Sequence, residues 1–396
     1  MKYDFSTVMD RSGHDLIAAD VIPFDGISVR EGVSGIPMWV ADMSFPTAPC
    51  VLEAVRQRLA FPNFGYFSES EEYYQAIINW QRTRNGTDHL TRDQIGYENG
   101  VLGGISSAIR ALTSPGDPIL LHSPTYVGFT HVLEDTGRRA VISSLVRDDQ
   151  GIWRMNYEEM DRILRERKIH LAVFCSPHNP AGRVWERWEI EKAMQVYAAN
   201  DCLVISDEIW SDLILPGYRH IPTQSVSEDA RERTLAFYSP SKTFSLAGMI
   251  SSYHVVYSRR LRDRLRREGE LTHYNSQNVL SMAALIGAYT KGAPWLEELL
   301  QVLDHNIGYA CDFFRQRFPE IRIMRPQGTY MLFLDCGEWC RKHGVAIREL
   351  QRRGVRAGVI WQDGEAFRWP DSIRMNLALP FSLLEEALGR LSGLSI

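Results

Sequence analysis

The sequence predicts an α/β protein with two parts: a large domain on a mainly parallel sheet and a smaller α+β domain. Three observations lead to this prediction. The chain has 396 residues, 44% of them hydrophobic, which is enough for two cores. From about residue 94 to residue 256, short apolar runs alternate with helical patterns. After a long amphipathic helix at 297–318, this alternation gives way to a mixed pattern of strands and helices.

The large domain is expected to start with a helix at 48–59, after an irregular segment that is rich in Gly and Asp. Seven apolar runs then predict strands at 94–98, 119–122, 139–143, 170–176, 202–207, 234–238 and 253–256. Helical patterns fall between most of them, for example at 104–112, 157–167 and 189–199. Such alternation is typical of a parallel sheet that helices cover on both faces. Ligands of these sheets bind beyond the carboxyl ends of the strands.

The smaller domain is expected to combine both ends of the chain. Its predicted strands are 321–324, 330–334 and 373–377, and its predicted helices are 347–353 and 383–391. We place the large domain at 46–290 and the small domain at 1–45 together with 291–396. The long helix at 297–318 can bridge the two. The N-terminal arm closes on an apolar run at 36–43, so we expect it to pack across another part of the molecule or a second subunit.

Composition and charge narrow the class of protein. The formal net charge is −5, and the one dense basic run, 259–267, has leucines four residues apart and acidic residues after it, typical of a solvated helix face. We therefore expect no nucleic-acid partner. The N-terminus lacks the apolar segment of a secretory signal, and no apolar run is long enough to span a membrane. The six cysteines are scattered, and Cys336 and Cys340 lack the second pair that a zinc site needs. A soluble, reduced, cytoplasmic protein is expected.

The most informative stretch is Tyr238-Ser-Pro-Ser-Lys-Thr-Phe244, in which Lys242 follows a predicted strand. A lysine at the end of a buried strand is poorly solvated, so its amine loses a proton more easily and can form a Schiff base with a carbonyl. The alternative is a surface lysine in a serine-rich loop. The Ser-x-x-Lys pattern by itself is too short to decide between them.

Other polar residues follow neighbouring predicted strands. Asn99-Gly-Val-Leu-Gly-Gly104 stands between a strand and a helix, where backbone N–H groups at a helix N-terminus favour an anion. A plain turn is the alternative there. Asn179 follows the strand that ends at Ser176, and Asp207 ends the next strand. A buried carboxylate is costly unless it meets a cation, although a helix cap would also explain Asp207.

Together these residues match the needs of pyridoxal 5′-phosphate (PLP). This cofactor needs an amine for its aldehyde, an acid partner for its ring nitrogen, a donor for its phenolate oxygen, an aromatic stack and an anion cradle for its phosphate. The candidates, in that order, are Lys242, Asp207, Asn179, Tyr126, and residues 100–102 with Ser239.

The sequence resembles the PLP-dependent class I/II aminotransferase superfamily of fold type I, and within it the C–S lyases of the MalY/PatB type, also called cystathionine β-lyases. The resemblance covers nearly the whole chain. The motifs that carry it are Met38-Trp-Val-Ala-Asp-Met43, Phe64-Gly-Tyr66, Ser176-Pro-His-Asn-Pro-Ala-Gly-Arg-Val-Trp185, Ser206-Asp-Glu-Ile209, Ser239-Pro-Ser-Lys-Thr-Phe244, Leu246-Ala-Gly248 and Ile373-Arg-Met-Asn-Leu377.

The resemblance implies a role for each matching residue. Lys242 forms the Schiff base with the cofactor, Asp207 keeps the pyridine nitrogen protonated, and Tyr126 stacks on the ring. The remaining roles are Asn179 at the phenolate oxygen, Val101, Leu102 and Ser239 at the phosphate, and Arg374 at the substrate carboxylate, a bidentate pairing that suits a guanidinium. Tyr66 reaches the phosphate of the neighbouring subunit, so a homodimer with shared active sites is implied.

Four positions depart from the pattern of the resembling family. Trp210 stands where these lyases usually have His and aminotransferases have Tyr; an indole N–H is also a donor to the cofactor, with a different geometry. Ser245 stands where Asn is usual in the lyases, and Gln327 stands where Glu is common. Ile250 replaces the phosphate-binding cation of many aminotransferases, which counts against a standard aminotransferase.

The resemblance thus implies α,β-elimination on cystathionine or an L-cysteine S-conjugate, giving a thiol, pyruvate and ammonia. An aminotransferase, or a decarboxylating or deaminating variant acting on an amino acid, uses the same chemistry at the substrate α-carbon and stays open. A non-catalytic regulatory binding protein is a third possibility. The intact set of Lys242, Asp207, Asn179 and Arg374 argues against it.

Overall fold

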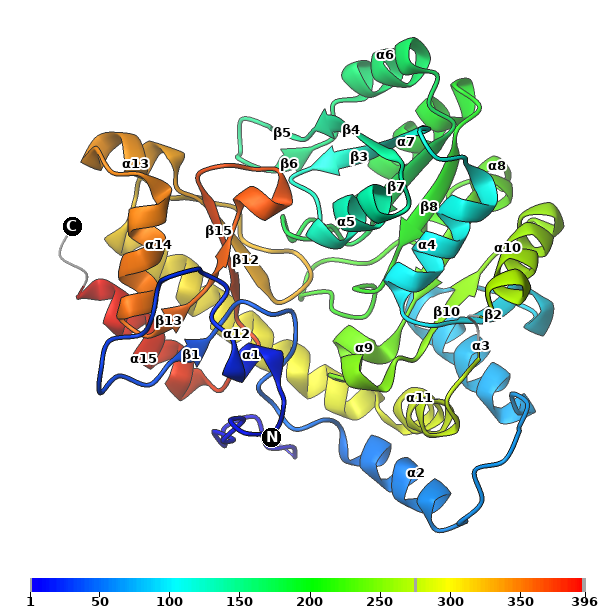
Figure 1. Ribbon diagram of the computed structural model, residues 1–396, viewed down its shortest axis with the longest axis horizontal. Coiled ribbons are helices and arrows are strands. Elements are labelled where there is room, and N and C mark those ends of the chain that lie inside the picture. Colours follow the sequence, from blue (N-terminus) through cyan, green and yellow to red (C-terminus); the bar gives the residue numbers. More distant parts are fainter. Residues whose placement is uncertain (1, 274–275, 394–396) are drawn as a thin grey trace.

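The structure is a computed structural model that describes residues 2–273 and 276–393 (Figure 1). Its main sheet has seven strands in the order β2-β10-β9-β8-β7-β3-β4. The strands are β2 (Ile95–Glu98), β3 (Pro118–Ser123), β4 (Arg139–Ser144), β7 (Leu171–Cys175), β8 (Leu203–Asp207), β9 (Thr234–Tyr238) and β10 (Ser252–Val255). The pairs among β4, β3, β7, β8 and β9 are parallel, and β10 is antiparallel to both neighbours. The predicted mainly parallel sheet and its seven strands are confirmed.

Helices cover both faces of this sheet, because consecutive side chains of a strand point to opposite sides. Ile119 and Leu121 of β3 belong to one apolar cluster, and Leu120 belongs to the other. The first cluster includes buried residues of α4 (Val101–Leu112), α5 (Val127–Asp135) and α10 (Arg259–Thr272). The second includes buried residues of α6 (Tyr157–Arg167) and α7 (Arg187–Ala199). Every residue of β7, β8 except Leu203, and β9 is buried, as a sheet covered on both faces requires.

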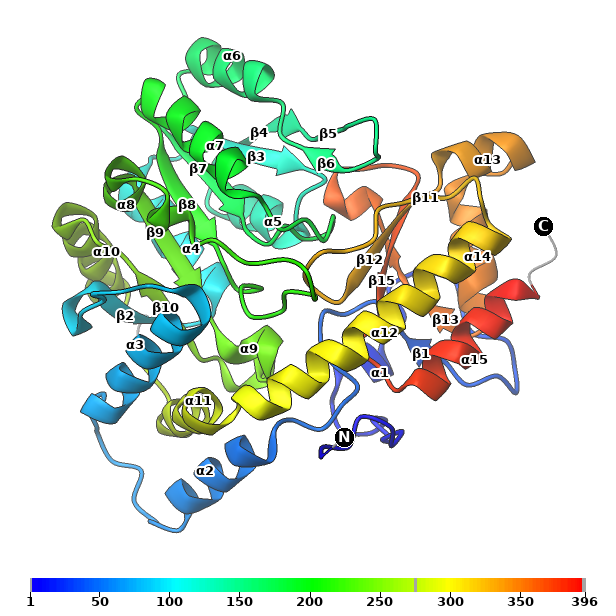
Figure 2. The same ribbon diagram turned by 180° about the vertical axis from the view of Figure 1, so that it is seen from behind.

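A second, smaller sheet is antiparallel, in the order β11-β12-β15-β14. Its strands are β11 (Arg322–Ile323), β12 (Met331–Asp335), β14 (Gln362–Asp363) and β15 (Ser372–Asn376). Helices α13 (Gly337–His343), α14 (Ile347–Arg356) and α15 (Phe381–Ser392) lie beside it (Figure 1). Figure 2 shows α12 (Ala293–Arg317) running as one long helix from α11 (Val279–Lys291) to the region of α14 and α15.

The N-terminal segment packs on its own chain. Strand β1 (Ile36–Pro37) pairs in parallel with β13 (Val359–Ile360), and α1 (Ile17–Asp20) lies nearby. The Phe5 ring lies 5.2 Å from the Phe45 ring and 5.3 Å from the Trp295 ring of α12. The expectation that the arm crosses another part of the molecule is thus met within the chain.

Several elements lie outside the predicted set. They are α3 (Glu71–Asn85), α5, α8 (Glu228–Arg233), α9 (Pro240–Thr243), α11, α13, and the hairpin of β5 (Val146–Arg147) and β6 (Trp153–Arg154). The helix predicted at 48–59 is α2 (Pro49–Leu59). Within the described residues, no helix is both long and apolar enough to cross a bilayer, and no group of His, Cys, Asp or Glu side chains is arranged to hold a metal ion.

Candidate active site

Four of the predicted residues follow parallel strands of the main sheet at their carboxyl ends. Tyr126 follows β3, Asn179 follows β7, Asp207 ends β8, and Lys242 follows β9. The strand register aligns these ends, because Cys175 of β7 lies opposite Asp207, which in turn lies opposite Phe237 of β9. The structure therefore gathers the four side chains at one edge of the sheet, where parallel α/β proteins bind ligands.

Lys242 lies on the short helix α9, which Ser239 caps by accepting a hydrogen bond from the Ser241 N–H. Its Nζ donates to the carbonyl oxygen of Ala41 at 2.8 Å and lies 5.8 Å from the centre of the Trp210 ring. Burial, together with the positive charge of Arg374, lowers the pKa of the amine to about 8. A solvated surface lysine, the alternative for this motif, is therefore wrong.

Asp207 is 4% exposed and has no cation within ion-pair distance among the described residues. The N–H of Ile209 donates to its Oδ1 at 3.1 Å. Burial raises the pKa of this carboxyl to about 7. No helix begins directly after Asp207, since the next helical turn is η2 (Thr223–Ser225), so the helix-cap alternative is wrong. The site holds a carboxyl group that lacks a positive partner.

Arg374 comes from β15 of the smaller sheet and is 3% exposed. Its Nη1 donates to Asn179 Oδ1 at 3.0 Å, and its Nη2 donates to the Trp39 carbonyl at 3.0 Å and to Gln362 Oε1. All these acceptors are neutral, and Nε is buried without an acceptor among the described residues. Burial lowers the pKa of Arg374 to about 10. The guanidinium is thus held in place without a carboxylate partner.

The predicted phosphate cradle lies at the start of α4. Gly100 adopts φ +80° ahead of this helix, and Val101 and Leu102 form its first turn, where backbone N–H groups have no partner within the helix. The ends of β2, β10 and β9 are adjacent, since Ser252 pairs with Glu98 and Ser239 Oγ donates to the Ser251 carbonyl. This places Ser239 near the start of α4, in a setting suited to an anion.

Two aromatic residues line the same edge. The Tyr126 ring lies 5.4 Å from the Phe129 ring, edge to face, and a Cβ on Gly128 would lie 2.5 Å from it, so only glycine leaves room there. Trp210 is 2% exposed and packs on the Tyr330 ring at 4.8 Å. Its indole N–H donates to no acceptor among the described residues, which leaves it available to a ligand.

Tyr66 is the one predicted residue that the structure does not bring to this cluster. It lies in the segment between α2 and α3 and is fully exposed, and its neighbours Phe61 and Phe64 are more than half exposed. These aromatic side chains have little apolar surface of their own chain to cover them. Only the sequence motif indicates a role for Tyr66. That Tyr66 reaches the site of a second subunit stays a prediction.

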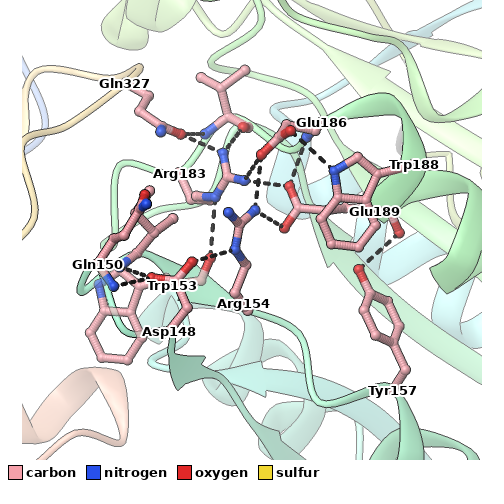
Figure 3. Close-up of polar contacts among 12 residues, drawn as sticks. Asp148, Gln150, Trp153, Arg154, Tyr157, Arg183, Glu186, Trp188, Glu189 and Gln327 are labelled. Atoms are coloured by element: carbon pink, nitrogen blue, oxygen red, sulfur yellow. Dashed lines mark hydrogen bonds and ion pairs between the residues drawn. The ribbon is translucent and has the colours of Figure 1, made fainter.

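A buried ionic cluster supports the loop that carries Asn179 (Figure 3). Arg183 is 1% exposed and donates to Glu189 Oε2, which is equally buried, and to Glu186 Oε1 at 3.0 Å. Arg154 donates to the other oxygen of Glu189 at 3.0 Å. Gln327 Oε1 accepts from Arg183 and from the Val184 N–H, so an amide suffices where the resembling family often has Glu.

Two other residues that depart from the family pattern have unusual backbone conformations. Ser245 has φ +55° and Ile250 has φ +47°, both in the left-handed region that Gly and Asn adopt more easily. An Asn at position 245, as in the resembling lyases, would suit this conformation better than Ser. Ile250 is half exposed and offers no charge to an anion at the cradle.

No sequence pattern indicates the contacts that hold the segment 38–43 over Lys242. Asn376 Nδ2 donates to the Val40 carbonyl at 2.7 Å, and the Tyr330 hydroxyl donates to the Ala41 carbonyl at 3.0 Å. Arg11 pairs with Asp42 at 2.7 Å. A backbone carbonyl has no sequence signature, so only Asn376, within a matching motif, could have been found in advance.

Comparison with known proteins agrees with this arrangement. The family model "Aminotransferase class I and II" matches residues 35–391. The cystathionine beta-lyase PatB of Bacillus subtilis is 31% identical over 359 residues, which are 90% of this chain and 91% of that protein.

Solved structures match over nearly the full length. Cystalysin from Treponema denticola, which contains a pyridoxal 5′-phosphate cofactor, has a TM-score of 0.92 and 29% identity, covering 99% of this chain and 98% of that chain. The PLP-bound C–S lyase from Staphylococcus hominis has a TM-score of 0.89 and 28% identity, covering 98% of each. With a mixed seven-stranded sheet, the strand-end cluster and a family match over most of its length, the chain belongs to the class I and II aminotransferase family of fold type I.

Proposed function

We propose that the protein is a PLP-dependent C–S lyase that performs α,β-elimination on cystathionine or another L-cysteine S-conjugate. The observation that carries the proposal is the buried cluster itself. The carboxyl group of Asp207, which lacks a cation, ends β8, and the amine of Lys242 follows the adjacent parallel strand β9. Arg374 lies near both without a carboxylate partner. The full-length relatives named as C–S lyases support the choice of reaction.

The residues present fit PLP. Asp207 is a buried carboxyl without a cation, and a protonated pyridine nitrogen is the partner that would keep it ionised. Lys242 is a desolvated amine suited to hold the aldehyde. The first turn of α4, with the Val101 and Leu102 amides, and the Ser239 hydroxyl suit the phosphate. When bound, PLP supplies an electron sink that stabilises negative charge at the substrate α-carbon.

The remaining side chains at this edge would hold the ring. We assign Tyr126 to the ring face, because it is partly buried near Asp207 and Arg374 at the edge where ligands bind. Asn179 would donate through its amide nitrogen to the phenolate oxygen while its Oδ1 accepts from Arg374. The free indole N–H of Trp210 is a second donor on that side.

Arg374 would bind the substrate α-carboxylate. Its contacts to Asn179, Gln362 and the Trp39 carbonyl fix the guanidinium plane, and neutral acceptors leave its charge uncompensated. A bidentate carboxylate is the ligand that this geometry prefers. The amino group of the substrate would then face Lys242, which lies close enough to Arg374 for the charge of the guanidinium to lower its pKa.

Lys242 Nζ would take the proton from the substrate α-carbon, because a pKa of about 8 leaves part of the amine neutral near pH 7. The bond from Cβ to sulfur then breaks and the sulfur leaves as a thiolate, which is a tolerable leaving group with a thiol pKa of about 8.5. Addition of water releases the remaining three carbons as pyruvate and ammonia. The segment 38–43, held by Asn376 and Tyr330, covers the amine and limits the access of water.

The active form would be a homodimer in which Tyr66 reaches the cofactor phosphate of the second subunit. The full exposure of Tyr66, with Phe61 and Phe64 beside it, supports this proposal. We also keep the division into a large domain at 46–290 and a small domain at 1–45 with 291–396. The six free cysteines accord with the proposed cytoplasmic location.

A product assay tests the reaction. The purified enzyme is supplied with PLP and a panel of cysteine S-conjugates, including cystathionine, and pyruvate, thiol and ammonia are measured. The proposal expects equal amounts of thiol and pyruvate, with turnover abolished in Lys242→Ala. Glutamate formed from 2-oxoglutarate, without pyruvate or thiol, would instead identify an aminotransferase. Full turnover in Lys242→Ala would contradict the assignment of the base.

A further inference from the structure

A cavity of about 530 Å³ lies apart from the Lys242 site. It is formed by the end of α3 with the residues after it, by the segment 219–225, and by the end of β10. Its lining includes polar side chains such as Gln81 and Asn85 and less polar ones such as Pro222, Val255 and Tyr257. A cavity that combines apolar walls with convergent polar groups is the usual form of a small-molecule site.

The charged residues around this cavity are mostly positive. Arg187, Arg219 and Arg231 line it, against one aspartate, Asp88. Arg219 and Arg231 have no carboxylate partner among the described residues, whereas Arg187 lies 3.6 Å from Glu191. This local excess contrasts with the net charge of −5 for the whole chain. Unpaired guanidinium groups at the mouth of a cavity attract an anion and can bind a carboxylate or a phosphate through paired N–H groups.

An aromatic ring holds the side chain of Arg231 in place. The Arg231 guanidinium lies 5.3 Å from the centre of the Tyr257 ring, which holds its charge beside the apolar wall. A ligand with an apolar or carbon skeleton and one anionic group would therefore satisfy both kinds of lining. The cavity volume suits a small organic molecule better than a macromolecular segment.

Buried hydrogen bonds lead from the cavity to Glu208, the residue next to Asp207. His220 lines the cavity, is 5% exposed, and its Nε2 lies 2.8 Å from Glu208 Oε2. The hydroxyl of Tyr238, which also lines the cavity, donates to the same oxygen at 2.7 Å. Glu208 is fully buried and follows Asp207 directly, and Tyr238 ends the strand that leads to Lys242. The ring nitrogen Nδ1 of His220 has no hydrogen-bond partner among the described residues.

We propose that this cavity binds a small organic anion bearing a carboxylate or phosphate group, and that the bound anion alters catalysis through His220 and Glu208. An anion bound beside His220 would shift the position of its ring, and with it the 2.8 Å contact between Nε2 and Glu208 Oε2. Because Glu208 is adjacent to Asp207, a change in its hydrogen bonds shifts the position of the carboxyl that we assign to the cofactor ring. The effect on catalysis rests on the proposed function, whereas the binding itself does not.

The test uses the PLP-loaded enzyme, in which the phosphate cradle is filled. Citrate serves as the carboxylate probe and glycerol 3-phosphate as the phosphate probe, and binding is measured by titration calorimetry. We expect saturable binding of at least one probe, weakened about tenfold in Arg219→Ala and again in Arg231→Ala. Arg260→Ala is the matched control, because it removes an exposed arginine of α10 that also lacks a carboxylate partner.

Each outcome is informative. Absence of saturable binding overturns the proposal, and so does binding that survives both cavity substitutions, because the probe then occupies another site such as Arg374. The coupling through Glu208 is refuted if the probe binds the wild-type enzyme, and Arg219→Ala abolishes this binding, but the bound probe leaves kcat, KM and the cofactor absorbance of the wild type unchanged. A change in KM or kcat that disappears in Arg219→Ala, while basal activity stays at the wild-type level, supports both parts. Since calorimetry needs no turnover, failure of the lyase proposal would not affect the binding result.

Discussion

Replacing Asp207 with asparagine in the cofactor-free protein tests the electrostatics on which the site depends. Burial raises the folded-state pKa of this carboxyl from 3.8 to about 7. Between these values the unfolded chain has lost the proton while the folded protein still holds it. The free energy of unfolding therefore falls as the pH rises through this window.

The size of the effect follows from the width of the window. Each pH unit corresponds to about 1.4 kcal/mol while the folded carboxyl keeps its proton, and the slope falls near pH 7, where this carboxyl is partly ionised. Raising the pH from about 5 to about 7 should therefore destabilise the wild type by about 2 kcal/mol relative to Asp207→Asn. Urea denaturation of both proteins at several pH values, at one protein concentration, measures this difference. Asp149→Asn, which removes an exposed carboxyl, is the matched control.

PLP should abolish this difference. A protonated ring nitrogen next to Asp207 would keep the carboxylate ionised, so the PLP-loaded wild type should not lose stability over the same pH range. The reasoning is refuted if the cofactor-free wild type and Asp207→Asn have parallel pH profiles. It is also refuted if bound PLP leaves the wild-type profile unchanged.

Three further predictions concern single side chains. Arg374→Gln should lower kcat/KM about a hundredfold, mainly by raising KM, because the substrate carboxylate loses a charge-assisted contact worth about 3 kcal/mol. Steady-state kinetics with a cysteine S-conjugate measures this change. An unchanged KM would contradict the role of Arg374. Glu189→Gln should destabilise the fold by about 3 kcal/mol in denaturation, since it removes the buried carboxylate partner of Arg183 and leaves only the solvent-exposed Glu186, while KM of the folded enzyme stays the same. Trp210→Phe should weaken PLP binding about fivefold in a titration, since it keeps the ring but removes the free indole N–H, and equal affinity would show that this donor is unused.

The main sheet could be predicted from the sequence because its strands are buried on both faces. Such strands are continuous apolar runs, and those at 170–176 and 202–207 have no competing helical period. The hairpin of β5 and β6 escaped prediction because each strand has only two residues. The antiparallel direction of β10 depends on its pairing with β2, about 155 residues earlier in the chain, which no local pattern reports.

Some residues of the site could likewise be predicted from the sequence, and others could not. Asn179, Asp207 and Lys242 could be grouped in advance because each follows a strand, and parallel strands end at one edge. Arg374 lies 195 residues from its partner Asn179, so their contact depends on how the smaller sheet packs against the larger one. Only the family motif indicated Arg374. Gln362 and the Ala41 carbonyl could not be found, because a lone glutamine and a backbone oxygen carry no distinctive pattern.

The most direct measurement locates the bond between the cofactor and the protein. Borohydride treatment of the PLP-loaded enzyme makes this bond permanent, and mass spectrometry of the digested chain identifies the peptide that carries the added mass. We predict a single adduct on Lys242, in the peptide that follows β9, and none after Lys242→Ala. An adduct on another lysine, or a wild-type protein that carries none, would contradict the assignment on which the proposed chemistry depends.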